Sequence, residues 1–283
     1  MERVGVIGLG QMGEGIATNL VNSGFETSVF DVRPEPVDRL QALGATVTKS
    51  YAEIAQFSDV VHVVVFDDAQ TIDVCDGSPD APGLLAKLES GSLVILHSTI
   101  QPATVQALAQ RGAERGVHVI DAAMTGGSGP AAMAGQLTLM VGAPTELVER
   151  CRPMFDAIAE RVFHVGALGQ GVTAKIVNNL VLEMYVMVVR DGLQLASGAG
   201  IDESTMLEIL NDGGTGWSYP SKNWENIRGF EATHPQGPLG LVDMTKKDLS
   251  LAVALADALG CQLAPARAVV SDVLPNLSSG LTR

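Results

Sequence analysis

The chain has 283 residues, of which 46% are hydrophobic and 18% charged, and its formal net charge is −14 at pH 7. This length favours two domains that each bury a core, and the negative charge argues against nucleic acid or an anionic membrane surface as a partner. The three cysteines, Cys75, Cys151 and Cys261, are far apart and predict reduced thiols, with neither a disulfide framework nor a metal site. No signal peptide and no run of about 20 apolar residues is visible, so we expect a cytoplasmic protein without a membrane segment.

The first predicted elements are a strand at residues 4–7 and a helix at residues 14–23, joined by a glycine-rich turn. The turn reads Gly8-Leu9-Gly10-Gln11-Met12-Gly13, which is the G-x-G-x-x-G pattern. Its glycines allow a tight turn and let the backbone approach a pyrophosphate, whose charge meets the amides at the start of the next helix. Gly24 is placed to end that helix.

A second strand, predicted at residues 27–30, ends at Asp31. This acid lies near the spacing of about 20 residues at which a carboxylate binds the ribose hydroxyls of a dinucleotide. The order of strand, glycine turn, helix, strand and acid therefore predicts a dinucleotide site. Asp31 favours NAD over NADP, because a carboxylate repels a 2′-phosphate, while the nearby Arg33 leaves NADP possible.

Short apolar runs continue to alternate with helical patterns up to about residue 165, which predicts parallel strands with right-handed crossovers. We therefore expect an α/β fold in which residues 1–165 form a Rossmann-type domain with a mostly parallel sheet. The further strands are expected at residues 60–66, 93–96, 117–120, 137–141 and 162–165.

After residue 166 no further β-rich run appears, so residues 166–283 are expected to form an all-helical domain for substrate binding and dimerisation. A long apolar helix is predicted at residues 172–196, and shorter helices at 202–211, 218–228 and 241–259, before a small polar tail after Pro275. Gly166, Gly169 and Gly171 mark the junction of the two halves. The long helix is apolar on almost every side, which is explained by burial in its own domain or by a shared subunit interface.

Three polar groups could take part in chemistry. Lys175 and Asn179 lie four residues apart on the long helix, and a lysine near a helix N-terminus has a lowered pKa that suits proton transfer; the alternative is a lysine that extends to solvent. Residues 121–129, expected directly after a strand, contain Thr125-Gly126-Gly127 and could bind a carboxylate through free amides, or form only a tight loop. Lys246-Lys247 supplies local positive charge, or is a solvated pair.

Taken in order, these motifs resemble the β-hydroxyacid dehydrogenases, the family of 3-hydroxyisobutyrate dehydrogenase and tartronate semialdehyde reductase. The resemblance covers nearly the whole chain and includes Gly169-Gln-Gly171, Asn178-Asn179 and Lys247-Asp-Leu-Ser-Leu-Ala252. It implies hydride transfer between NAD and a small 3-hydroxy acid or its semialdehyde, by a homodimer or homotetramer.

The resemblance also implies a role for each site residue. Lys175 is the expected catalytic acid/base, and Thr125, Gly126, Gly127 and Asn179 are expected to hold the substrate carboxylate and hydroxyl. The expected cofactor-binding residues are Gly8, Gly10, Gln11, Met12, Gly13, Asp31, Val65, Phe66, Thr99 and Lys247.

The chain departs from the family at two positions: Phe66-Asp67-Asp68 replaces a common Leu-Pro, and Thr125 replaces the usual serine. Two other functions are compatible with the fold, namely a dinucleotide-binding module without catalysis and a decarboxylating enzyme similar to 6-phosphogluconate dehydrogenase. Lys175 argues against the first, and the scarcity of arginine after residue 190 argues against a phosphate site of the second.

Overall fold

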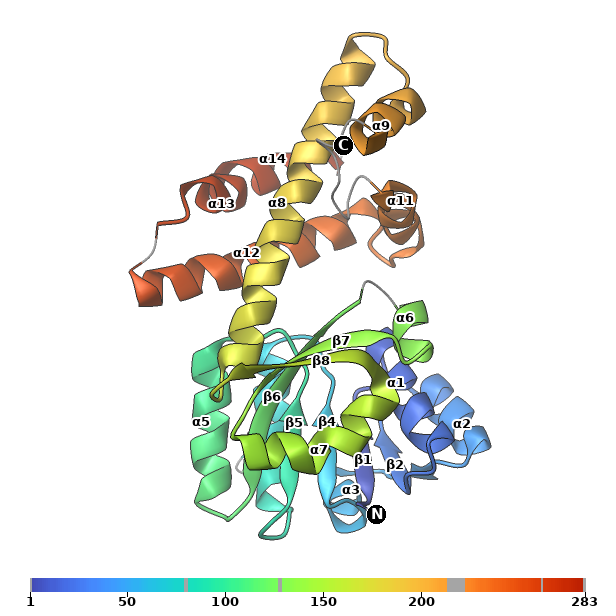
Figure 1. The fold of residues 1–283 in the computed structure, drawn as a ribbon, viewed down its shortest axis with the longest axis vertical. Helices are drawn as coiled ribbons and strands as arrows, with labels where there is room; N and C mark the ends of the chain where they lie inside the picture. Colours follow the sequence, from blue (N-terminus) through green and yellow to red (C-terminus); the bar gives the residue numbers. More distant parts are fainter. Residues whose placement is uncertain (1, 79–80, 127–128, 213–221, 261, 282–283) are drawn as a thin grey trace. The chain divides into compact units, whose positions relative to one another are not determined.

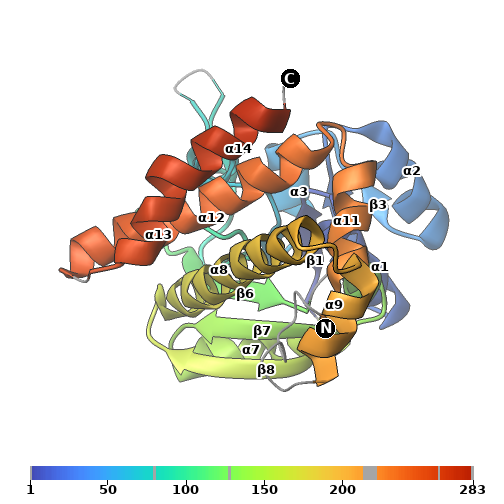
Figure 2. The same ribbon diagram turned by 90° about the horizontal axis from the view of Figure 1, so that it is seen from above.

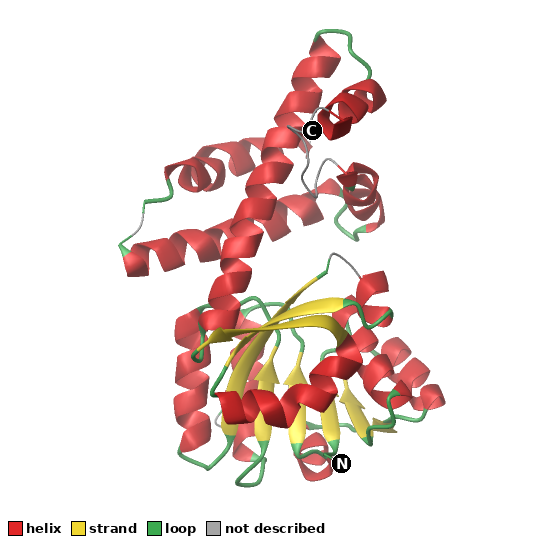
Figure 3. Ribbon diagram, in the orientation of Figure 1, coloured by secondary structure: helices red, strands yellow, loops and turns green. Residues whose placement is uncertain are grey.

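The structure is a computed structural model that describes residues 2–78, 81–126, 129–212, 222–260 and 262–281. It divides into two compact units, Met1–Lys175 and Ile176–Arg283. In the described residues, strands occur only in the first unit (Figure 3). The division falls inside the long helix α8 (Gln170–Gly198). The sequence pattern changes a few residues earlier, at residue 166.

The first unit is built on an eight-stranded sheet with the order β3-β2-β1-β4-β5-β6-β7-β8 (Figure 1). The strands β1, β4 and β5 are buried at every residue, as expected for apolar strands that are covered on both faces. The bounds are β1 Val4–Ile7, β2 Thr27–Phe30, β3 Thr46–Val47, β4 Val60–Val63, β5 Leu93–Leu96, β6 His118–Thr125, β7 Leu137–Gly142 and β8 Ala159–Gly166. The α/β fold with a mostly parallel sheet is thus confirmed.

Helices cover both faces of this sheet and give three layers. One core cluster joins the sheet to α1, α2, α6 and α7, and the other joins it to α3, α4, α5 and the 3₁₀ turn η1. The bounds are α1 Gln11–Asn22, α2 Pro34–Leu43, α3 Tyr51–Phe57, α4 Asp68–Asp76, η1 Leu84–Ala86, α5 Pro102–Ala113, α6 Gly129–Met133 and α7 Thr145–Ile158. Gly24, with φ +84°, follows the end of α1 as predicted.

One pairing departs from the predicted parallel strands, because β7 runs antiparallel to β6. Between Thr125 and Leu137 the described residues contain only the short helix α6, and a parallel crossover needs about a dozen residues or more. A second departure is β3, a strand of two residues that the sequence pattern does not indicate. The expected strand at residues 60–66 ends earlier, at Val63.

The described part of the second unit is helical. Its elements are most of α8, then α9 Glu203–Asp212, α11 Trp224–Thr233, α12 Pro238–Leu259, α13 Ala264–Ala268, the π-helical turn η2 Val269–Val273 and α14 Leu274–Leu281. α12, α13 and α14 lie side by side (Figures 1 and 2), and together with α8 they form one core cluster that includes Val186, Met187 and Leu249. The polar stretch after Pro275 is helical as far as Leu281, where α14 ends, and residues 282–283 lie outside the described residues.

α8 is long and apolar enough, by length and composition alone, to cross a membrane. The same properties fit the central helix of a water-soluble domain, and α8 contributes buried side chains to the core cluster of the second unit. It also carries the buried polar residues Asn179 and Glu183. α8 thus combines buried side chains with apolar side chains that are exposed.

Candidate active site

The glycine turn after β1 has the geometry of a phosphate-binding turn. Gly8 has φ +89°, and a Cβ on it would meet the carbonyl oxygen of Val64. A Cβ on Gly13 would overlap the carbonyl oxygen of Gly8, so this glycine allows the start of α1 to pack closely against the strand. A Cβ on Gly10 would meet no atom within 4 Å. The three glycines therefore serve the turn, the close packing and an open approach to the backbone.

This turn fits the pyrophosphate of NAD. Gly10 is the N-cap residue of α1 and provides no side-chain hydrogen bond to the helix. The first amides of a helix lack partners inside it and favour an anion, and the open space beside Gly10 is where a Cβ would obstruct one. Gln11 and Met12 form the first turn of α1. The pyrophosphate site predicted at Gly8–Gly13 is compatible with this geometry.

Asp31 follows β2 and its side chain is only 7% exposed. Its carboxylate accepts hydrogen bonds from the amide of Leu9, at 2.6 Å, and from the amide of Arg33, at 2.8 Å. The Arg33 guanidinium also binds it, with 3.1 Å between Nε and Oδ1. Burial acts to raise the pKa of Asp31, but the hydrogen bonds from Arg33 and Leu9 outweigh it and lower the pKa, so the group is ionised at neutral pH.

The loops after β4 and β5 carry the next predicted cofactor residues. The hydroxyl of Ser98 donates to the carbonyl of Val65 at 2.7 Å and so ties the two loops together. Phe66 is 56% exposed, and its amide donates to Gln70. Thr99 is partly buried beside Ser98.

The two aspartates that follow Phe66 have structural partners. Asp67 caps α4 by accepting from the amide of Gln70, at 2.9 Å. Asp68 accepts from the amide of Gln101 and the hydroxyl of Thr104, at 3.0 and 2.6 Å, at the start of α5. The departure from Leu-Pro thus supplies hydrogen bonds that fix the start of two helices.

The parallel strands β2, β1, β4, β5 and β6 lie in that order, so their carboxyl ends meet at one edge of the sheet. This edge brings together the predicted residues of the first unit that follow or end these strands, which are Gly8, Asp31, Val65, Thr99 and Thr125. Ligands of such sheets bind at this edge, where the strand order reverses between β1 and β4.

Thr125 is the last residue of β6, and residues 121–125 belong to that strand rather than to a loop after it. The sequence pattern placed the end of the strand too early, at residue 120. Gly126 has φ +138°, a conformation that favours glycine. Gly127 lies outside the described residues.

Lys175 and Asn179 lie one turn apart on α8, as predicted. Lys175 is partly buried. Asn179 is buried and donates from Nδ2 to the carboxylate of Asp248 on α12, at 2.8 Å. Lys247 approaches the same carboxylate, with 3.2 Å from Nζ to Oδ1. Asp248 therefore holds both Asn179, a predicted substrate-binding residue, and Lys247, a predicted cofactor-binding residue.

Sequence reasoning gave no role to Asp248 or to a second buried acid, Glu183. Glu183 is 2% exposed and accepts from the hydroxyl of Thr245 at 2.6 Å. It lies four residues after Asn179 on the same helix, so the spacing of Lys175, Asn179 and Glu183 gives one polar line along α8. Glu183 could therefore have been predicted from the sequence, because it continues the four-residue spacing of polar residues along an otherwise apolar helix.

A buried histidine pair was also missed. His62 of β4 and His97, after β5, are 0% and 2% exposed, with 2.8 Å from Nδ1 of His62 to Nε2 of His97. His97 Nδ1 must donate to the carbonyl of Ala122, at 2.7 Å, so its Nε2 accepts the proton of His62 Nδ1. His62 Nε2 then has no partner among the described residues. Burial lowers the pKa of both rings, that of His97 to about 4.

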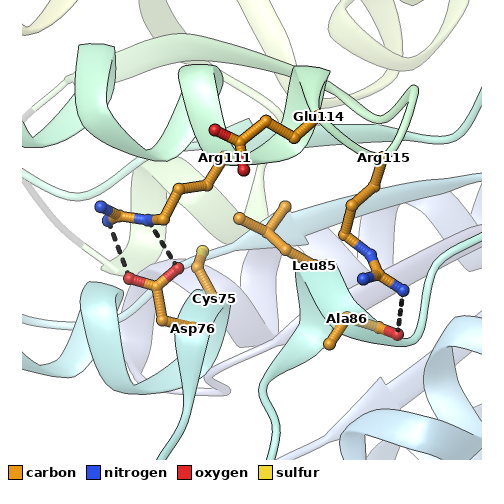
Figure 4. Close-up of a pocket in the computed structure, with 7 residues that line it drawn as sticks. All are labelled: Cys75, Asp76, Leu85, Ala86, Arg111, Glu114 and Arg115. Carbon is orange, nitrogen blue, oxygen red and sulfur yellow. Dashed lines mark hydrogen bonds and ion pairs between the residues drawn. The ribbon is translucent and has the colours of Figure 1, made fainter.

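The first unit also has a hollow of about 330 Å³ away from the carboxyl edge of the sheet, at the ends of α4 and α5 (Figure 4). The guanidinium of Arg111 pairs with Asp76 at 2.7 Å, and Arg115 donates to the carbonyl of Ala86. Burial raises the pKa of the Cys75 thiol to about 12, so it is not a nucleophile at neutral pH. This hollow contains none of the predicted site residues.

Two family models together match nearly the whole chain. The model described as the NAD binding domain of 6-phosphogluconate dehydrogenase matches residues 3–166, and the one described as the NAD-binding domain of NADP-dependent 3-hydroxyisobutyrate dehydrogenase matches residues 169–281. With the glycine turn and the acid after β2, these matches define an NAD(P)-dependent oxidoreductase.

Curated proteins and solved structures give the family. The chain is 33% identical to the NAD-dependent L-serine dehydrogenase of Pseudomonas aeruginosa over 91% of this chain and 86% of that protein. It is 32% identical to the L-threonate dehydrogenase of Cupriavidus necator, over 89% and 83%. The crystal structure of 3-hydroxyisobutyrate dehydrogenase from Salmonella typhimurium matches with a TM-score of 0.86 and 28% identity, over 99% of this chain and 95% of that one. The protein belongs to the β-hydroxyacid dehydrogenase family and is a dehydrogenase of hydroxy acids.

Proposed function

We propose that the protein oxidises the hydroxyl of a small 3-hydroxy acid to the semialdehyde or ketone, reversibly, with Lys175 as acid/base. The observation that carries the proposal is the polar line on α8, where Lys175 precedes by one turn a buried Asn179 that Asp248 fixes in place. Burying a polar side chain on an apolar helix costs free energy unless it is hydrogen-bonded, and here Asp248 supplies that bond, so the pair is a built polar site within the helix packing. The reading of Asp31 favours NAD as the preferred cofactor.

NAD, when bound, supplies the acceptor for the hydride that leaves the carbinol carbon. Lys175 takes the hydroxyl proton as the carbonyl forms, and returns it in the reverse reaction. Thr125 and the amides of Gly126 and Gly127 bind the substrate carboxylate, while Asn179 orients the hydroxyl. Among the cofactor residues we assign Gln11 and Met12 to the pyrophosphate, Val65, Phe66 and Thr99 to the nicotinamide side, and Lys247 to a contact with cofactor and substrate.

The test of the lysine is Lys175→Met, which keeps an unbranched side chain as far as Cε and removes the amine. We expect turnover to fall by about 10² to 10⁴-fold with NADH affinity unchanged, since general acid/base help is worth that much. The exposed Lys49→Met variant is the matched control. Equal turnover in the Lys175 and Lys49 variants would refute the assignment.

The substrate is proposed as a class, because the relatives differ in the acid they are named for: L-serine, L-threonate and 3-hydroxyisobutyrate. Each carries a hydroxyl at the third carbon and a carboxylate. The test is a panel of these acids with NAD, followed by nicotinamide absorbance. Turnover of acids that carry a hydroxyl only at the second carbon, with no turnover of any 3-hydroxy acid, would contradict the proposal.

We further propose that α8 pairs with a second copy of the chain, as a homodimer or within a homotetramer, in the cytoplasm. The support is a line of exposed apolar side chains at helical spacing, which we call the α8 apolar face: Val177, Val181, Tyr185, Val188 and Leu195, between 48% and 77% exposed. An exposed apolar line of this kind is typical of a protein–protein interface. Cys75 and Cys151 are free thiols, as suits a reducing compartment.

A further inference from the structure

Asp121, in β6, is a fully buried carboxylate whose partners are the backbone amides at the start of α8. Its side chain is 0% exposed. Oδ1 accepts from the amide of Gly169 at 2.7 Å, and Oδ2 accepts from the amide of Val172 at 2.8 Å. These are amides of the kind that a helix N-terminus leaves without partners, and the acceptor comes from a strand about 50 residues earlier in the chain.

Glycines enclose this carboxylate on two sides. Gly142 stands opposite Asp121 in β7, and a Cβ on it would lie 2.7 Å from Oδ1. A Cβ on Gly171 would lie 2.7 Å from Oδ2. Gly169 itself has φ +86°, which favours glycine. Both glycines of the Gly169-Gln-Gly171 motif therefore stand where a side chain would disturb the contact between Asp121 and the start of α8. Gly171 also packs against the carbonyl oxygen of Met140, which a Cβ would meet as well.

The same residue connects two segments of the proposed site within the first unit. Val172 precedes Lys175 by three residues of helix, a rise of about 4.5 Å along the axis. Thr125 follows Asp121 by four residues on the same face of β6, about 13 Å along the strand. The carboxylate therefore fixes the first turn of α8 against the strand that ends at Thr125.

We propose that Asp121 is a positioning residue for the catalytic lysine, which it places by holding the amides of Gly169 and Val172. The proposal rests on the proposed role of Lys175. Loss of one of the two hydrogen bonds lets the first turn of α8 shift, and a displacement of about 1 Å in a catalytic group costs on the order of 10²-fold in rate.

The ionised form of Asp121 is the one that accepts from both amides. Burial raises the pKa of Asp121 to about 6, against the lowering effect of the amide hydrogen bonds of Gly169 and Val172. The residues opposite it on the neighbouring strands, Leu96 and Gly142, carry no charge, and the nearest charged side chain along α8 is Lys175. Below about pH 6 the carboxyl group is protonated, and one of its oxygens then carries a proton that points at an amide N–H. That oxygen no longer accepts a hydrogen bond, so the attachment of Asp121 to the start of α8 weakens.

The experiment is a double-mutant cycle of Asp121→Asn and Lys175→Met. Asparagine keeps the shape but turns one acceptor into a donor. We expect the kcat of the wild type to fall as pH drops through about 6. We expect D121N alone to lower kcat by about 10 to 10²-fold, to leave NADH affinity within twofold, and to remove that pH dependence. In the K175M background D121N has no further effect on kcat, because both act through one group. The exposed Asp38→Asn variant is the control.

The outcomes separate the two proposals. Additive losses in the cycle, or a parallel loss of NADH affinity in D121N, would refute the positioning role while leaving the lysine assignment intact. Full turnover by K175M would refute the lysine assignment itself.

A second measurement needs no variant and covers the case in which D121N does not fold. In wild-type protein with NADH bound, amide hydrogen exchange at residues 169–173, corrected for its intrinsic pH dependence, should rise relative to the rest of the first unit as pH falls through 6. The fall in kcat should follow the same pH dependence. Corrected exchange that stays constant between pH 5 and 8 would refute the positioning role.

Discussion

The two units differ in how completely they bury their apolar side chains. The core clusters of the first unit consist mostly of fully buried residues on both faces of the sheet. In the described part of the second unit there is one smaller cluster, and neither α9 nor α11 has a buried residue. The α8 apolar face is exposed as well. The described part of the second unit therefore leaves more apolar surface exposed than the first, which is the basis for the proposal that α8 pairs with a second copy.

The largest effect is expected at the glycines of the first unit. Gly13→Ala places a Cβ on the carbonyl oxygen of Gly8, so we expect the free energy of unfolding to fall by roughly 3 kcal/mol or more. We also expect this variant to lose NAD binding. Gly10→Ala meets no atom and has an ordinary φ of −64°, so the free protein keeps its melting temperature. It loses NAD affinity by about 10 to 100-fold, because an amide–phosphate contact is obstructed.

Calorimetry and NADH fluorescence titration check this pair of variants. Gly229→Ala, at an exposed position inside α11 where a Cβ would meet no atom within 4 Å, is the control and is expected to leave both readouts unchanged or to raise stability slightly. Unchanged NAD affinity in Gly10→Ala would show that the pyrophosphate does not approach this glycine.

These strands and glycines are the parts of the molecule that sequence predicts best. β1, β2 and β5 have the predicted ends, because strands buried on both faces appear as short apolar runs between polar residues. The direction of β7 could not be read in this way, since apolar runs look the same in parallel and antiparallel pairs. β3 was too short to give a pattern.

The residues of the site also differ in how well the sequence predicts them. The glycine turn and Asp31 are local patterns, with their spacing set by a single strand–helix–strand unit. The clamp of Asp121 on Gly169 joins residues 48 positions apart, and the bond of Asn179 to Asp248 joins residues 69 apart. Such partners become visible only when the fold brings them together.

The next largest effect concerns the second unit. Val181→Asp with Val188→Asp puts two charges on the α8 apolar face, and burying them against a second copy would cost several kcal/mol. We expect the double variant to sediment as a monomer, while Leu43→Asp, at an exposed apolar position of the first unit, keeps the wild-type mass. An unchanged mass of the double variant in sedimentation velocity would show that the face has another role.

The buried histidine pair, His62 and His97, makes the stability of the first unit depend on pH. The pKa of His97 lies at about 4 and that of His62 also lies below its ordinary value, so the folded state favours the neutral rings. Their contribution to stability is complete above the ordinary pKa of 6.5 and is lost as pH falls toward 4, on the order of 3 kcal/mol for His97 alone.

Chemical denaturation of the wild type and of the double variant His62→Leu, His97→Leu between pH 7 and 4 measures this contribution. Asp121 has the opposite effect on stability, because its raised pKa favours the folded state at low pH. Both proteins contain Asp121, so subtracting their free energies of unfolding at each pH cancels this contribution. The exposed His118→Leu variant should follow the wild type. A pH dependence shared by all three proteins would place the acid sensitivity elsewhere.

The smallest effect tests whether the first unit also selects its cofactor. Asp31 and Arg33 are bound to each other, so each determines how the other can meet the ribose. Asp31→Asn weakens the repulsion of a 2′-phosphate and releases Arg33 to bind it, so the ratio of kcat/KM for NAD over NADP should fall by about tenfold, or ~1.4 kcal/mol. Arg33→Ala leaves the carboxylate unopposed, and the same ratio should rise. If the ratio changed in the same direction in both variants, the pair would not face the ribose. Other residues at the carboxyl edge of the sheet would then determine the preference for NAD or NADP.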